Sequence, residues 1–75
     1  MRKFYKVNGS RFVEIFFVDT INEWHAYLID VEVHKAISVI RNTDRIKLIA
    51  NIVTDNWFKS NIDNFALFLE DILKY

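Results

Sequence analysis

Cysteine and proline are absent from this 75-residue sequence, and glycine occurs only once. Without cysteine, the chain can form neither a disulfide nor a thiolate metal site. A single glycine excludes a glycine-rich phosphate-binding loop. Long apolar runs are also missing. No stretch approaches the roughly 18 residues that cross a membrane, so no membrane partner is expected.

The residues that are present are typical of a small globular protein. Hydrophobic residues make up 52% of the chain and charged residues 27%, with ten basic and ten acidic side chains. This composition excludes a disordered chain, and the length predicts a single domain over residues 1–75. The basic start is followed by alternating residues rather than an apolar run, so a cytoplasmic protein without a signal peptide is expected. Enrichment in Ile, Asn, Lys and Phe indicates AT-rich coding, as in phages and mobile elements.

Asn8-Gly9 is the clearest local signal. This pair favours a type I′ turn, in which both residues take positive φ, and so predicts a hairpin that joins the first residues to a strand over 11–18. That second strand is apolar on both faces, which is typical of a central or interface strand.

The loop length of the hairpin determines which residues face each other. A two-residue loop sets Tyr5 opposite Phe12, a favourable aromatic pair. It also sets Lys6 opposite Arg11, which is unfavourable. A three-residue loop therefore remains an alternative.

Residues 24–29 fit two different elements. Their β-forming residue types predict a third antiparallel strand, paired with its neighbour in the sequence. A capping box at Thr20 and Glu23, with an apolar stripe through Trp24 and Leu28, fits a helix instead. The strand is favoured.

Helices are predicted in the rest of the chain. Residues 31–41 carry an apolar face at helical spacing, and residues 45–53 fit a helix slightly better than a strand. Residues 55–59 are expected to form a loop. A final helix from Ile62 to Leu73 is expected to supply much of the core. The predicted fold class is therefore α+β, a hairpin extended to three strands and packed against two or three helices.

Catalytic chemistry has little support in the sequence. Only His25 and His34 could serve as histidine bases or ligands, and zinc sites need three or four ligands at defined spacings. No Gly-x-Ser-x-Gly motif is present. The protein is predicted not to be an enzyme, and no catalytic residue, metal or cofactor is expected.

Charge is arranged in blocks along the chain. Residues 1–18 are mostly basic, residues 19–34 carry only acids besides histidine, and residues 35–47 are again mostly basic. Such blocks suit self-association, or docking on a charged partner such as a DNA-handling protein.

The basic hairpin offers an alternative function, the binding of single-stranded nucleic acid. Its aromatic rings would stack on bases while its cations contact phosphates. The absence of net charge argues against this function. The candidate nucleic-acid-binding residues are Lys3, Tyr5, Lys6, Arg11, Phe12 and Phe16.

The aromatic content, 16% of the chain, favours a protein interface. Aromatic residues are enriched at the centres of such interfaces, and a core this small does not easily hold all of them. The predicted function is a non-enzymatic protein-binding module, a homodimer that regulates or inhibits a larger protein. The candidate protein-binding residues are Trp57, Phe58, Leu67, Phe68 and Tyr75.

Overall fold

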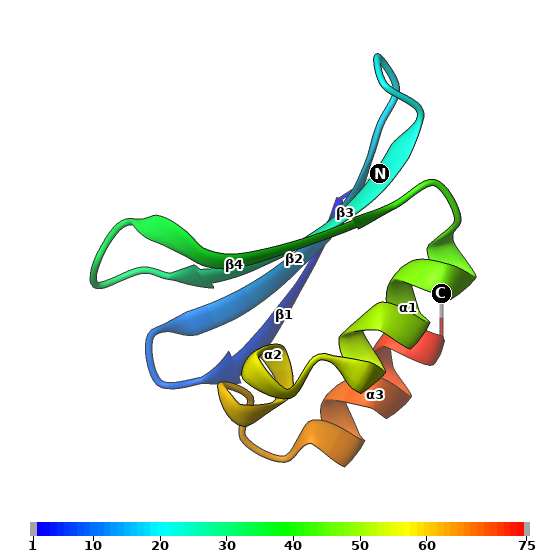
Figure 1. Cartoon of the computed structure of the whole chain (residues 1–75). Coiled ribbons are helices and arrows are strands. Elements are labelled where there is room, and N and C mark those ends of the chain that lie inside the picture. Colours follow the sequence, from blue (N-terminus) through cyan, green and yellow to red (C-terminus); the bar gives the residue numbers. More distant parts are fainter. Residues whose placement is uncertain (1, 75) are drawn as a thin grey trace.

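Four strands form one antiparallel sheet in the order in which they occur in the chain (Figure 1). The computed structural model describes residues 2–74, and its strands are β1 (Arg2–Asn8), β2 (Arg11–Val18), β3 (Glu23–Asp30) and β4 (Lys35–Asn42). Three helices follow, α1 (Arg45–Thr54), α2 (Asn56–Ser60) and α3 (Phe65–Leu73). The α+β class is confirmed, with four strands rather than three.

The predicted hairpin is confirmed, but its register is shifted. β1 and β2 are joined at Gly9, which has a φ of 25°. The pairing is irregular between Lys6 and Asn8, so Tyr5 lies opposite Val13 rather than Phe12. Because side chains alternate along a strand, this shift places Tyr5 on one face of the sheet and Phe12 on the other.

The helix predicted over residues 31–41 is wrong, because this segment forms a turn and then β4. The register with β3 shifts between Leu28 and Ile29, which leaves Ile37 as an extra residue in β4. A bulge of this kind changes the alternation, so Ile37 and Ile40 both pack against the core. Their spacing of three residues imitates one face of a helix.

The two ambiguous segments take the favoured form. Residues 24–29 lie in β3, and residues 45–53 lie in α1. The helix begins after Asp44, whose side chain accepts a hydrogen bond from the Lys47 backbone N–H at 3.0 Å. This cap satisfies one of the free N–H groups of the first turn.

The last part of the chain contains a short helix that the sequence did not predict. Residues 55–59, expected to be a loop, include most of α2, and the Asp55 side chain accepts a hydrogen bond from the Phe58 N–H at 2.8 Å. The final helix, α3, begins at Phe65 rather than at Ile62. Asn64 precedes it with a φ of 47° and caps the Leu67 N–H at 3.3 Å.

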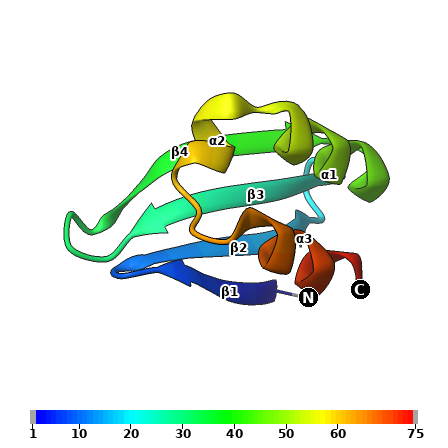
Figure 2. The same cartoon turned by 90° about the horizontal axis from the view of Figure 1, so that it is seen from below.

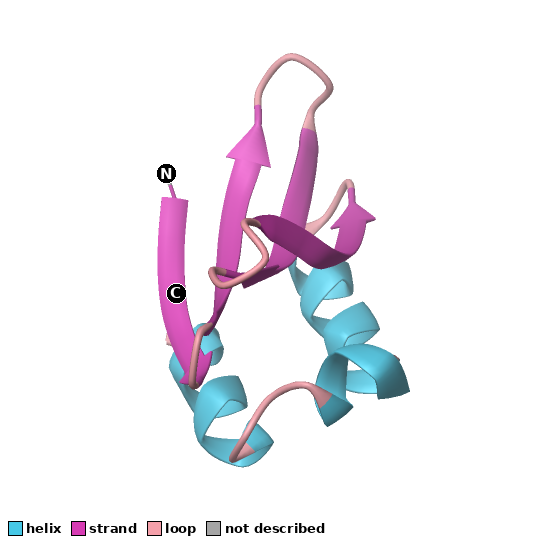
Figure 3. Cartoon of the chain, turned by 90° about the vertical axis from the view of Figure 1, so that its left-hand side faces the viewer, coloured by secondary structure: helices cyan, strands magenta, loops and turns pink. Residues whose placement is uncertain are grey.

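All three helices lie against the same face of the sheet (Figures 1 and 2). Turning the molecule shows the strands on one side and the helices on the other (Figure 3), so the described chain has two layers. The core fills the space between them, and its most deeply buried side chains are Val13, Ala26, Leu28, Leu48, Ile52, Phe58 and Ile72.

A polar network around Asp30 joins the ends of β2 and β3 to the helical layer. The Asp30 carboxylate accepts hydrogen bonds from the Ser10 hydroxyl at 3.0 Å and from Arg11 Nε at 3.2 Å. The Arg11 side chain also donates to Asn61, in the loop after α2. Burial acts to raise the pKa of Asp30, but the hydrogen bonds from Ser10, Arg11 and the Glu32 backbone, with the charge of Arg11, outweigh it and lower the pKa below 3.8.

We expect this network to make the folded state sensitive to acid. Because the folded pKa of Asp30 is lowered, its stabilising effect is complete above 3.8 and is lost as the pH falls through the folded value. The free energy of unfolding, measured with urea from about pH 2 to pH 7, should fall less steeply below this point in Asp30→Asn than in the native chain. Parallel pH profiles would contradict the assignment.

The fold also predicts opposite effects of substituting two adjacent aromatic residues. Phe58 is completely buried whereas Trp57 is 62% exposed. Phe58→Ala should therefore lower the free energy of unfolding by about 3–5 kcal/mol. Trp57→Ala, the matched control, should lower it by about 1 kcal/mol or less. Chemical denaturation followed by circular dichroism measures both, and equal losses would show that Phe58 is not a core residue.

Candidate functional site

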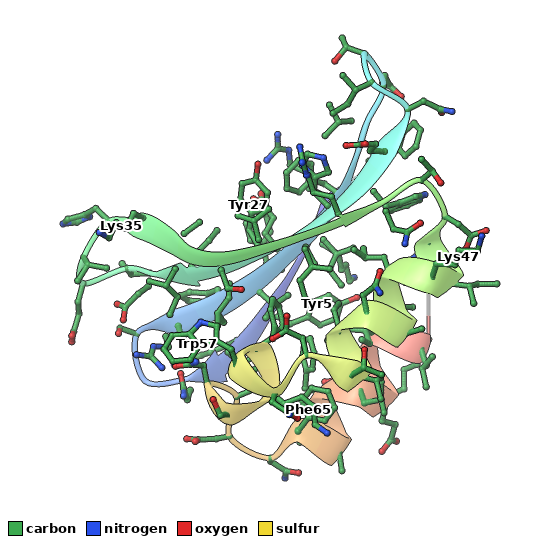
Figure 4. All side chains as sticks on the ribbon, in the orientation of Figure 1. Tyr5, Tyr27, Lys35, Lys47, Trp57 and Phe65 are labelled. Carbon is green, nitrogen blue, oxygen red and sulfur yellow. The ribbon has the colours of Figure 1, made fainter. Side chains whose placement is uncertain are left out.

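The structure separates the candidate protein-binding residues into two groups. Trp57 on α2 and Leu67 on α3 are exposed, by 62% and 53%, and Trp57 is labelled in Figure 4. Phe58 and Phe68 belong to the core, so their expected place on the surface is wrong. Tyr75 lies outside the described residues.

The candidate nucleic-acid-binding residues are divided between the two faces of the sheet. Lys6, Phe12 and Phe16 lie on the face opposite the helices. Lys3 and Tyr5 lie on the helical side, where the Tyr5 ring meets the Phe68 ring edge to face at 5.8 Å. The register shift in the hairpin therefore removes Tyr5 from the expected aromatic face.

Arg11, the remaining member of that set, is engaged within the protein. Its side chain bonds both Asp30 and Asn61, as described for the polar network. A guanidinium held in this way positions the hairpin on the helical layer, and its charge is paired with Asp30, which leaves it less available to a phosphate.

We call the sheet surface opposite the helices the open sheet face. Figure 4 shows Tyr27 projecting away from the helices, on this face, and Tyr5 projecting toward them. The strand registers align its side chains in three rows across β1, β2, β3 and β4. The first row is Arg2, Phe16, His25 and Arg41; the middle row is Phe4, Glu14, Tyr27 and Val39; the last row is Lys6, Phe12, Ile29 and Ala36.

The charge at the centre of the open sheet face is neutralised. Arg2 Nη1 donates to Glu14 Oε2 at 2.8 Å, and the Arg2 guanidinium lies over the Phe16 ring, 4.4 Å from its centroid. Glu14 is only 7% exposed, and a buried carboxylate needs such a partner. Lys6 and Arg41 are exposed as well, and they occupy diagonally opposite corners of the face.

Three rings pack together beside this ion pair. The Phe16 ring centroid lies 5.6 Å from that of His25 and 5.1 Å from that of Tyr27, and the His25 and Tyr27 rings are stacked at 5.8 Å. Phe16 and His25 are thereby buried although no helix covers them. The cluster gives the open sheet face an ordered aromatic centre.

An apolar hollow of about 280 Å³ adjoins this centre. Only apolar side chains line it, namely Phe4, Phe12, Ile29 and Val31. Phe4 is 60% exposed at one edge of the sheet, and Val39 is 48% exposed at the other. The open sheet face is thus apolar from β1 to β4, apart from its ion pair and its corner cations.

A second groove, of about 370 Å³, runs between β1 and α3. Its walls combine the core rings of Tyr5 and Phe68 with the exposed Leu67, and Asp63 and Asp71 add carboxylates. The groove is less apolar than the open sheet face, because charged side chains form part of its lining.

The histidines provide no metal site in the part of the chain that the structure describes. His25 Nε2 lies 3.2 Å from Glu23 Oε1, whereas its buried Nδ1 has no hydrogen-bond partner among residues 2–74. His34 is exposed in the turn before β4. No group of three or more metal-ligating side chains occurs within these residues. Over the same range, no helix is long and apolar enough to cross a membrane.

Part of the open sheet face could be foreseen from the sequence. The alternation of β2 already placed Phe12, Glu14 and Phe16 on one side, and both sides of this strand are apolar. Phe4, Tyr27 and Val39 were missed, because their position depends on the hairpin register and on a β4 strand that the periodicity did not indicate. Comparison with protein family models, curated proteins and solved structures finds no match for this chain.

Proposed function

We propose that this protein is a non-enzymatic protein-binding module that docks its partner through the open sheet face. In this proposal it is a homodimer, encoded by a phage or mobile element, that regulates or inhibits a larger cytoplasmic protein, such as one that handles DNA. The observation that carries the proposal is the apolar sheet surface left without a helical layer.

The size and chemistry of this surface support a protein partner. Exposed apolar patches that cover a contiguous area mark interaction sites, whereas scattered apolar residues do not. Here Phe4, Tyr27 and Val39 share one row, and the adjoining hollow has only apolar walls. An aliphatic or aromatic side chain fills such a hollow without leaving a polar group unpaired.

A second candidate function is the binding of single-stranded nucleic acid to the same face. It is favoured by the position of Lys6 and Arg41 at the corners, around the rings of Phe4, Phe12 and Tyr27. Stacked bases and phosphate contacts need this combination. Phe16 is less suited to stacking, because the Arg2 guanidinium already covers its ring.

The protein-binding proposal predicts a loss of partner capture when the open sheet face is made polar. Phe4→Ser and Val39→Ser remove exposed apolar side chains and should reduce the recovery of the partner from cell extract by about tenfold or more, as at interface hot spots. Ile46→Ser is the matched control, since Ile46 is 78% exposed on α1, in the helical layer. Quantitative mass spectrometry of affinity eluates measures recovery, and equal recovery by all three variants would refute the assigned surface.

The nucleic-acid alternative predicts binding that weakens as salt increases. Fluorescence anisotropy with a single-stranded oligothymidine should show affinity at low salt that is lost in Lys6→Glu and retained in Lys47→Glu, a control on α1. Tyr27→Ala should weaken binding by roughly 1–3 kcal/mol, the value of one stacked base. Absence of binding at low salt would eliminate this candidate.

A further inference from the structure

We propose that the protein covering the open sheet face is a second copy of this chain. Two sheets would pack face to face around a twofold axis that runs parallel to the strands. This inference rests on the proposed function, because it names the partner of the same surface. It is argued from the order of side chains in the three rows.

A twofold axis above the boundary between β2 and β3 keeps each row in place and reverses the order of the strands. β1 then faces β4 of the second copy, and β2 faces β3. In such an isologous interface every contact occurs twice. Each row therefore faces the same row of the second copy read in the opposite direction, so each residue can be compared with the one that it would meet.

The middle row is self-complementary in this arrangement. Phe4 meets Val39 of the second copy, which pairs two exposed apolar side chains. Glu14 meets Tyr27 of the second copy, and a phenolic hydroxyl can donate a hydrogen bond to a carboxylate. Within residues 2–74, the Tyr27 hydroxyl makes no side-chain hydrogen bond of its own.

The other two rows match as well. In the first row Phe16 lies opposite His25 of the second copy, and these rings are already buried within each copy, with the Arg2 guanidinium over Phe16, so they add no polar mismatch and little new contact. In the last row Phe12 meets Ile29, two walls of the apolar hollow. Arg2 opposite Arg41 is the one pairing of like charges, and its cost is reduced because Arg2 is bound to Glu14 at 2.8 Å.

The alternative twofold axis, perpendicular to the strands, gives a poorer match. It keeps the strands in place and exchanges the first and last rows. Glu14 would then lie opposite Glu14 of the second copy, and Arg2 opposite Lys6. Placing two buried carboxylates against each other opposes association. The side-chain order thus selects one of the two ways in which these faces can stack.

The area and the charge of the chain also permit self-association. Four strands at the usual spacing, each seven or eight residues long, give a face of about 19 by 25 Å on each copy. The two faces together measure about 950 Å², which is the size of a weak or transient interface. Ten basic and ten acidic residues leave no net charge to hold two copies apart. Aligned sheets cross at about 30°, so the contacts near the axis, Glu14 with Tyr27, are the best preserved.

Sedimentation equilibrium of the full chain, from about 5 to 500 µM, tests the inference by measuring the dissociation constant of the dimer. We expect a Kd on the order of micromolar. Val39→Arg should raise this Kd by at least about tenfold, because it places a cation against an apolar partner. Tyr27→Phe, which removes only the hydroxyl, should raise it by about tenfold. Ile46→Arg is the matched control and should leave the Kd unchanged. Circular dichroism verifies folding, and Val39→Ser replaces the arginine variant if that variant unfolds.

A crosslinking experiment tests the direction of the axis. Because the chain has no cysteine, the variants Phe4→Cys and Val39→Cys each carry a single thiol. Mixed in equal amounts and treated with a short bismaleimide, they should give mainly the Phe4→Cys to Val39→Cys product, with one variant tagged for identification. Predominant crosslinks between identical variants would overturn the proposed axis.

The outcomes separate this inference from the proposed function. A native chain that is monomeric at about 500 µM, but whose Phe4→Ser variant loses its captured partner, would overturn the second copy and the homodimer, and would leave the binding of a larger protein to the open sheet face standing. A dimer that is insensitive to both Val39→Arg and Tyr27→Phe would overturn the inference, since the copies would then meet elsewhere. If Phe4→Ser and Val39→Ser also captured the partner normally, the proposed function would fall with it.

Discussion

The sheet is apolar on both faces, but the helices form a single layer that covers only one of them. The rest of the structure follows from this mismatch. β2 contributes Val13 and Ile15 to the side that the helices cover and Phe12 and Phe16 to the side that they leave open. All three helices come after the sheet in the chain and pack on one side of it (Figure 2). Exposed apolar side chains on the second side, such as Phe4 and Val39, therefore stay in contact with water unless another molecule covers them.

Two irregularities in the sheet decide which side chains that molecule would meet. The shift between Lys6 and Asn8 turns Tyr5 inward against Phe68 and leaves Phe4 outward. The extra residue at Ile37 allows β4 to pack both Ile37 and Ile40 inward while Val39 stays outward. Bulges of this kind redirect side chains at the cost of one unpaired residue each. The edges of the open sheet face are set by these two positions.

Much of the fold could be predicted because the signals were local. The Asn8-Gly9 pair specified the hairpin, and β-forming residues specified the strand over 24–29. The prediction of a helix over residues 31–41 was wrong, because the bulge at Ile37 gives the apolar residues of this strand the spacing of a helix. The faces of the last helix were harder to assign. α3 has apolar side chains on most of its surface, so periodicity could not show that Phe68 would face the sheet while Leu73 would not.

The open sheet face was harder still to predict, since an apolar strand face is equally compatible with a core and with an interface. Which of the two it becomes depends on where helices far along the chain pack, and single-strand patterns contain no such information. Glu14 is the informative exception. An acid in the middle of an apolar face is costly to bury, and Arg2 offsets that cost within the monomer. If this position only had to be buried under a partner, an apolar residue would be more favourable there than an acid. Glu14 therefore favours a partner that places a specific group opposite it.

A second copy on the open sheet face would leave the helical layer as the outer surface on both sides of the dimer. Trp57, Leu67 and Ile46 would remain exposed there, each present twice. Two of the residues that the sequence indicated for partner binding are in this layer, whereas the proposed function places partner capture on the open sheet face. A second copy and a larger protein would therefore compete for the same surface. By mass action, self-association would lower the concentration of chains that are free to bind the larger protein, so the strength of the dimer would set how much of that protein is needed to displace the second copy.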